Sequence, residues 1–164
     1  MIKASEQAAD FGPPPSSTVQ EAIALAQAGD FKAAELRMLT AIEARPDDPL
    51  AWVTLAGIRG RAGDQRGEFD AIERALAIDP YYLPGLLLKG NWYEGQGNSK
   101  LAASMYRYAL QVTPAEPYWP EQLKAELTHA KHYVGHYARG LSRHLSERLA
   151  HLRADLERGD AERW

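Results

Sequence analysis

The stretch GDFKAAELRMLTAIEARPDDP, residues 29–49, decides the fold because its pattern returns twice. Residues 63–80 read GDQRGEFDAIERALAIDP, and residues 97–114 read GNSKLAASMYRYALQVTP, so the pattern recurs every 34 residues. A fixed period of this length is typical of stacked supersecondary repeats. The recurring columns are Gly29, Gly63 and Gly97; Asp30, Asp64 and Asn98; Ala41, Ala75 and Ala109; Pro46, Pro80 and Pro114; and Ala22, Ala56 and Gly90.

Each column has a physical role in a helical hairpin. Glycine accepts positive φ and can end a helix, and the Asp or Asn after it can cap the next one. Proline ends the second helix, and small residues let two antiparallel helices approach closely. The apolar spacing between these marks is helical. The pattern therefore predicts three pairs of helices, at residues 17–28 and 31–44, 48–61 and 65–78, and 82–95 and 99–112.

A 34-residue helical hairpin with these columns resembles the tetratricopeptide repeat. The second unit carries Trp52, Leu55, Ala56, Gly63, Ala75 and Pro80 at the family's positions, and the third carries Gly90, Tyr93, Gly97, Ala102, Tyr106, Ala109 and Pro114. The resemblance implies an all-α, right-handed solenoid of three repeats (16–46, 47–80 and 81–114). Two departures are Arg59, where an aromatic residue is usual, and Glu68, where alanine is usual. We expect the second repeat to pack less tightly for that reason.

The composition fits a single soluble domain. The chain has 164 residues, of which 45% are hydrophobic and 25% are charged, and its net charge of −3 offers no general attraction to nucleic acid or to an anionic membrane. It contains no cysteine, which excludes disulfides and thiolate chemistry. The N-terminal segment lacks the apolar core of a signal peptide, so we expect a cytoplasmic protein with no membrane or nucleic-acid partner.

The two ends of the chain differ from the repeats. Residues 1–15 are expected to be a flexible leader, residues 115–158 a connector with a long helix from about 121, and residues 159–164 a tail. The first half of this helix can cap the last repeat, as solenoids require. Its second half would carry an apolar stripe beyond the repeats, which needs a cover. That stripe comprises Leu141, Leu145, Leu149, Leu152 and Leu156.

Three fates of the stripe stay open at this point. A helical partner can cover it, a neighbouring domain can cover it, or the helix can break at Gly140 and fold back. The simplest alternative is that the end of the helix frays.

The resemblance also implies a concave groove formed by the first helix of each repeat. Matching by repeat position assigns to this groove the residues Val19, Ile23, Val53, Gly57, Arg61, Leu87, Asn91 and Glu94. Chaperone-binding members of the family hold a C-terminal carboxylate with Lys and Asn in the groove, and only Asn91 matches here. A groove of Val, Ile, Leu and Gly suits an apolar or helical segment. The alternative is that three repeats form no deep groove and that this face packs against the C-terminal helix.

No catalytic or metal-binding motif is present in the sequence. His129, His132 and His136 share one helical face opposite the leucine stripe, and histidines four residues apart can chelate a metal. No accompanying carboxylate completes a recognisable motif, so a solvated polar face is the preferred interpretation. We therefore expect no cofactor, no metal and no enzymatic activity from this chain. Trp52 is expected to lie in the core, whereas Trp92 and Trp119 are candidates for exposed aromatic residues.

A narrower resemblance covers the third repeat, the Tyr-Trp-Pro connector and the long helix. These segments are similar to the N-terminal repeat region of bacterial aspartyl/asparaginyl β-hydroxylase-type proteins. There, the repeats lead into an oxygenase domain that uses Fe(II) and 2-oxoglutarate, and no such domain is expected within this chain. The sequence thus predicts a non-catalytic scaffold for a protein or peptide, and the narrower resemblance implies its attachment to such an oxygenase. The alternative is a structural element that dimerises through the C-terminal helix.

Overall fold

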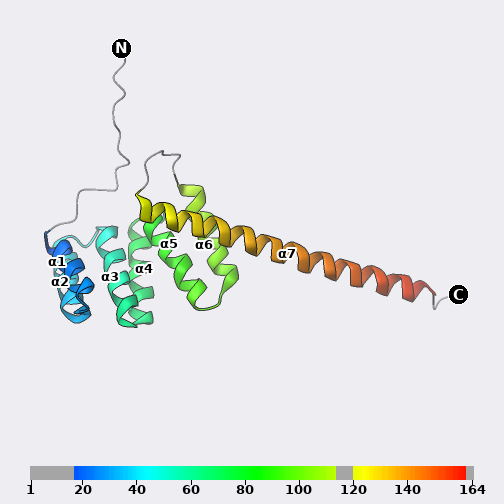
Figure 1. Ribbon diagram of the computed structural model, residues 1–164, viewed down its shortest axis with the longest axis horizontal. Helices are drawn as coiled ribbons and strands as arrows, with labels where there is room; N and C mark the ends of the chain where they lie inside the picture. The colour runs from blue at the N-terminus through cyan, green and yellow to red at the C-terminus, as the bar shows by residue number, and fades with distance from the viewer. Residues whose placement is uncertain (1–16, 114–119, 162–164) are drawn as a thin grey trace, which may run out of the picture.

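The chain forms three helical hairpins followed by one long helix. The computed structural model describes residues 17–113 and 120–161, with side chains beyond Asp155 described only at Arg158. Within these ranges every regular element is an α-helix. Figure 1 shows the hairpins side by side in a row, with α7 crossing the last of them and projecting far beyond it. The helices are α1 (Ser17–Gln27), α2 (Phe31–Ala44), α3 (Pro49–Ala62), α4 (Gln65–Ile78), α5 (Leu83–Gly95), α6 (Ser99–Val112) and α7 (Glu121–Ala161).

The predicted helices are confirmed. All six repeat helices begin and end within one residue of the predicted bounds, and α7 runs three residues past the predicted end. The expected leader, Pro114, the connector residues Tyr118 and Trp119, and residues 162–164 lie outside the described residues. The possibility of a break at Gly140 is wrong, because α7 is a continuous helix through that position.

The turn inside each hairpin is the same structure three times. Gly29, Gly63 and Gly97 have φ of 87°, 84° and 70°, and they are the positive-φ residues of the described chain. In the first hairpin the amide of Asp30 donates to the carbonyl of Leu25, five residues back, at 3.0 Å, while its carboxylate accepts from the amide of Ala33 at 3.0 Å. Asp30 therefore closes one helix and caps the next. Asp64 and Asn98 repeat both roles.

The core divides into two clusters. One lies among α1–α4 around Met38, Leu55 and Ile72, and the other lies among α5–α7 around Leu86 and Tyr106. Leu76 packs against both clusters. Polar contacts join the two halves as well, since Lys89 pairs with Glu73 at 2.5 Å across the α4–α5 junction.

The second hairpin is not loosely packed, so that expectation is wrong. Its two helices have the most extensive contact of any helix pair in the described chain. Gly60 provides the room for the unusual Glu68, whose carboxylate would lie only 2.7 Å from a Cβ at position 60. The unusual Arg59 donates to Glu35 on α2 at 2.8 Å and to the carbonyl of Gly67 at 3.2 Å. The two departures are thus accommodated by a glycine and by an ion pair between repeats.

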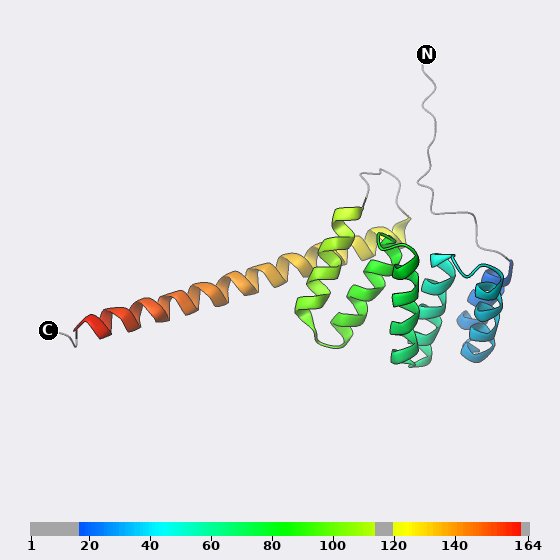
Figure 2. The same cartoon turned by 180° about the vertical axis from the view of Figure 1, so that it is seen from behind.

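Helix α7 changes role along its length. Its first part packs on α6 and more lightly on α5, with Leu127 and Ala130 buried. This confirms the predicted cap over the last repeat. The view from behind in Figure 2 shows the rest of α7 extending away from the repeats without a neighbouring element. At 1.5 Å per residue the 41-residue helix is about 60 Å long.

Gly90 sets the distance between α5 and α6. A Cβ at this position would lie 2.5 Å from the ring of Tyr106, which is fully buried. We expect Gly90→Ala to destabilise the protein by about 1 to 3 kcal/mol, because a rigid ring in a packed core must move. Chemical denaturation followed by circular dichroism measures the loss. Gly57→Ala is the matched control, since a Cβ there meets nothing within 4 Å; equal stability losses in the two variants would contradict this role for Gly90.

Candidate peptide-binding groove

A depression of about 240 Å³ lies between α1 and α3. Its lining is mostly apolar and comprises Ile23, Ala26, Gln27, Thr54, Gly57, Ile58 and Arg61. Gly57 leaves open space above the backbone of α3, because a Cβ there would touch nothing within 4 Å. The Thr54 hydroxyl donates to the carbonyl of Leu50 in its own helix, so its hydrogen is already engaged within α3. We call this depression the α1–α3 groove.

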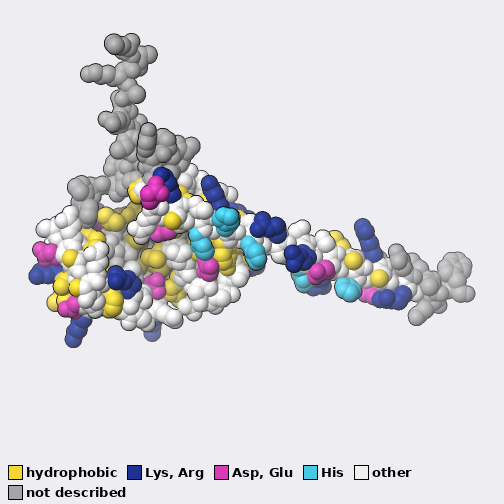
Figure 3. Space-filling view, in the orientation of Figure 1, with side chains coloured by type: hydrophobic (Ala, Val, Ile, Leu, Met, Phe, Trp, Pro, Cys, Tyr) yellow, Lys and Arg dark blue, Asp and Glu magenta, His cyan; other side chains and the backbone are white. Residues whose placement is uncertain are grey.

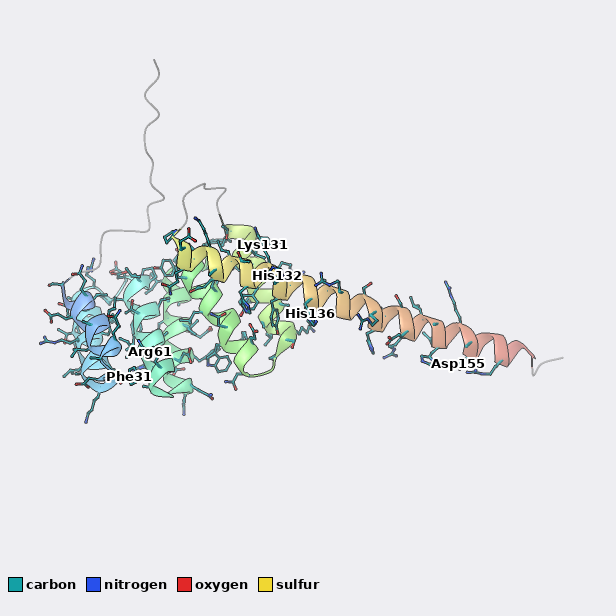
Figure 4. All side chains as sticks on the ribbon, viewed as in Figure 1. Phe31, Arg61, Lys131, His132, His136 and Asp155 are labelled. Atoms are coloured by element: carbon teal, nitrogen blue, oxygen red, sulfur yellow. The ribbon has the colours of Figure 1, made fainter. Side chains whose placement is uncertain are left out.

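One cation stands at the end of the α1–α3 groove. Arg61 is exposed, and its guanidinium lies 5.4 Å from the ring centroid of Phe31 at the start of α2. Figure 4 labels both side chains at this end of the repeats. Among the described residues Arg61 makes no ion pair, so its charge is available to a ligand carboxylate. Its planar donors suit a carboxylate well.

A second, more polar depression of about 170 Å³ lies between the start of α4 and the end of α5. Its lining comprises Gln65, Glu68, Asn91, Trp92, Gly95 and Gln96. Burial raises the pKa of Glu68. Trp92 is half-buried, donates its indole N–H to the carbonyl of Gln65 at 3.2 Å and packs on Phe69 with ring centroids 4.4 Å apart. Trp92 is therefore largely a packing residue.

The residues predicted to line the groove do not all lie in one depression. Ile23, Gly57 and Arg61 line the α1–α3 groove, and Asn91 lines the second depression. Val53 is half-buried outside both depressions, and Glu94 is engaged by α6 and α7. Val19 and Leu87 are only 2% and 1% exposed, so their assignment to an open groove is wrong. They pack into the two core clusters and line neither depression, whereas Val53 in the same repeat column stays half-buried.

Position matching missed part of the groove. Thr54 and Ile58 line it together with Gly57 and Arg61, and these four residues follow the spacing i, i+3, i+4, i+7 of one helical face. That spacing was visible in the sequence. Trp52 packs against the first core cluster, as predicted, and donates its indole N–H to the carbonyl of Pro46 at 3.0 Å. Trp119 lies outside the described residues.

The third repeat is tied to α7 by a polar cluster around Glu94. The Tyr106 hydroxyl donates to the Glu94 carboxylate at 2.5 Å and lies 2.6 Å from Asn91 Oδ1. His129 Nε2 lies 2.8 Å from the same carboxylate, and its ring packs edge-on against Tyr106. Burial raises the pKa of Tyr106, so the phenol stays protonated as a donor. Helix α7 thus covers part of the predicted groove face, which agrees with the alternative that this face packs against the C-terminal helix.

His129, His132 and His136 are all exposed, and the His129 side chain, although 50% exposed, also contacts Glu94 of α5. The preferred solvated face is therefore present, with one contact to the repeats that the sequence did not predict. Figure 3 shows the histidines gathered where α7 leaves the repeats, and Figure 4 labels His132 and His136 there. Among the described residues no group of three or more His, Cys, Asp or Glu side chains is arranged to hold a metal. None of the described helices has the length and hydropathy needed to span a bilayer.

Several solved structures have a fold similar to that of this chain. The Yersinia enterocolitica type III secretion chaperone SycD, in complex with a peptide of the translocator YopD, aligns over 77% of this chain and 92% of its own, with a TM-score of 0.65 and 14% identity. The first TPR of Spaghetti (RPAP3), bound to the HSP90 peptide SRMEEVD, aligns over 72% of this chain and 90% of its own, with a TM-score of 0.57 and 14% identity. The chain folds like a tetratricopeptide-repeat domain. No family model and no curated protein matches the sequence of this TPR-like chain.

The Glu94 cluster predicts a pH dependence of stability. Burial alone would raise the pKa of Glu94, but hydrogen bonds from Tyr106 and His129 and the charge of His129 outweigh it and lower that pKa below its ordinary value of 4.5. A lowered folded-state pKa stabilises the fold above that ordinary value, and the contribution is lost as pH falls through the folded-state pKa. We therefore expect the stability difference between the wild type and Glu94→Gln to be greater at neutral pH and to shrink as the pH falls below 4.5.

Urea denaturation over this pH range measures the difference. Glu147→Gln is the control, because Glu147 is an exposed carboxylate on the projecting part of α7. A difference between wild type and Glu94→Gln that stays constant across the range would contradict the assignment.

Proposed function

We propose that the chain is a non-catalytic scaffold that binds a segment of another protein in the α1–α3 groove. The observation that carries this proposal is a mostly apolar depression of about 240 Å³ with an arginine at its end that makes no ion pair with the described residues. Small-molecule sites usually enclose about 300 to 1,000 Å³, so this groove suits a single side chain of a larger ligand. The peptide-bound state of the two structurally similar proteins supports the same function class.

The lining indicates the chemistry of the ligand. Ile23 is the exposed apolar residue of the lining, and the nearly buried Ala26 and Ile58 lie beneath it, so the groove favours an aliphatic or aromatic side chain. Arg61 favours a carboxylate close to that side chain. The preferred segment therefore places an apolar residue next to Asp, Glu or a C-terminal carboxylate. We expect this interaction in the cytoplasm.

Substitution at Gly57 tests the proposal. The probes are short synthetic peptides in which a single Leu or Phe is flanked either by Asp and Glu or by Lys, with binding measured by fluorescence anisotropy. We expect the acidic peptides to bind. Gly57→Phe should weaken their binding at least about tenfold, because the ring fills the groove. Arg61→Ala should weaken their binding by about 1 kcal/mol or more, because a charge-assisted hydrogen bond is lost.

Gly140→Phe serves as the control, because it adds the same ring on α7, where a Cβ has open space. Binding that survives Gly57→Phe, or no binding by either peptide set, would overturn the proposal.

We also propose a more specific setting, in which the chain presents a client to a following oxygenase domain of the aspartyl/asparaginyl β-hydroxylase type. Its support is the sequence similarity of the third repeat, connector and long helix, together with the length by which α7 projects. The reading frame beyond Trp164 tests this setting: an adjoining domain with the iron ligands of a 2-oxoglutarate oxygenase supports it, and an immediate stop codon contradicts it.

A further inference from the structure

The projecting part of α7 carries an uncovered apolar stripe. Leu141, Leu145, Leu149 and Leu152 are 48%, 52%, 58% and 55% exposed, and none of them packs in either described core cluster. We infer that this segment, from residue 139 onward and here called the arm, pairs antiparallel with the arm of a second copy of the chain. The inference is independent of the proposed peptide groove.

The stripe continues an interface that already exists within the chain. Leu127, Ala130 and Val134 pack in the α5–α7 core cluster, and the apolar positions then run on with the same alternation of four- and three-residue steps. The full series is Leu123, Leu127, Ala130, Val134, Ala138, Leu141, Leu145, Leu149 and Leu152. Steps of four, four and three residues make an 11-residue repeat, whose period is close to that of the α-helix. The stripe therefore stays on nearly the same side of the helix. The arm thus offers helix-packing surface, aligned with the face that α6 covers.

This alignment decides the direction of pairing. Because the repeats pack on the same face of α7 that carries the stripe, they occupy the space beside its first part. In a parallel pair the partner's α7 would have to run through that space. In an antiparallel pair the partner's repeats lie beyond the opposite end of the arm, where Figures 1 and 2 show α7 standing clear.

The charges of the arm favour the same direction. Residues 139–153 contain four arginines and one glutamate, whereas residues 155–162 contain four acidic residues and one arginine. Antiparallel pairing places Asp155 of each copy near the basic start of the other arm, and charge pairs at the edges of helix pairs set partner orientation.

The leucine positions also match themselves in reverse. When Leu145 of one copy faces Leu152 of the other, the two copies of Leu149 meet beside the two-fold axis. Asp155, which pairs with Arg158 in its own helix, then lies near His144 of the other copy. The contact is small, at the weak end of specific interfaces, so we expect association that depends on concentration.

Sedimentation velocity of the full chain over a range of concentrations tests the inference. We expect a monomer–dimer equilibrium that Leu145→Glu with Leu149→Glu shifts at least tenfold toward monomer. Ala150→Glu, on the opposite side of the helix and exposed, should leave it unchanged. Circular dichroism checks that the helices remain folded. A chain that stays monomeric at every concentration, or dimers that tolerate the leucine substitutions, would overturn the inference.

Disulfide trapping tests whether the two arms run antiparallel. Because the sequence contains no cysteine, any disulfide must form between the introduced residues. A mixture of Leu145→Cys and Leu152→Cys chains should form a mixed disulfide dimer under mild oxidation, because these positions face each other in the antiparallel pair. Leu141→Cys alone should not cross-link, since its copies lie far apart. Efficient cross-linking of Leu141→Cys with itself would show a parallel pair and refute the arrangement.

Discussion

The architecture depends on one constraint, a turn of two or three residues that ends one helix and starts the next. Glycine at positive φ closes the first helix, and the following Asp or Asn donates its amide backward and accepts with its side chain forward. With so short a turn the second helix must fold back against the first. The buried alanines Ala22, Ala56, Ala75 and Ala109 then let the helix pairs approach closely. The stacking of hairpins, the groove between α1 and α3 and the seat of α7 all follow from this spacing.

Departures from the repeat pattern are compensated locally and give the chain its individual features. Arg59 and Glu68 replace residues that would pack in a typical repeat, and Gly60 and Glu35 accommodate them. In the third repeat, Gly90 makes room for the Tyr106 ring, and the hydroxyl of that ring reaches Glu94, which also binds His129 of α7. The same tyrosine thus fixes both the hairpin and the long helix. The α1–α3 groove lies at the other end of the row and keeps its open space.

The candidate site was predictable only in part. Ile23, Gly57 and Arg61 line the groove as the repeat register indicated, because neighbouring first helices expose similar positions. Val19 and Leu87 are buried, since the side that faces the second helices depends on packing with α2, α6 and α7. The prediction for the histidines was incomplete for a related reason. His129 is exposed, as the helical wheel of α7 indicated, but a wheel contains no information about Glu94 on another helix.

The sequence by itself determined the number of hairpins and the bounds of the repeat helices, whereas the continuity of α7 through Gly140 came from the structure. These depend on local preferences that repeat in register: glycine for positive φ, Asp and Asn for capping, proline for ending a helix and helical apolar spacing for packing. Only the tertiary structure decided which matched positions stay open, how Gly60 and Glu68 share space, and that the stripe on α7 is aligned with its packed face. Those outcomes depend on distances between helices far apart in the sequence, and no single helix encodes them.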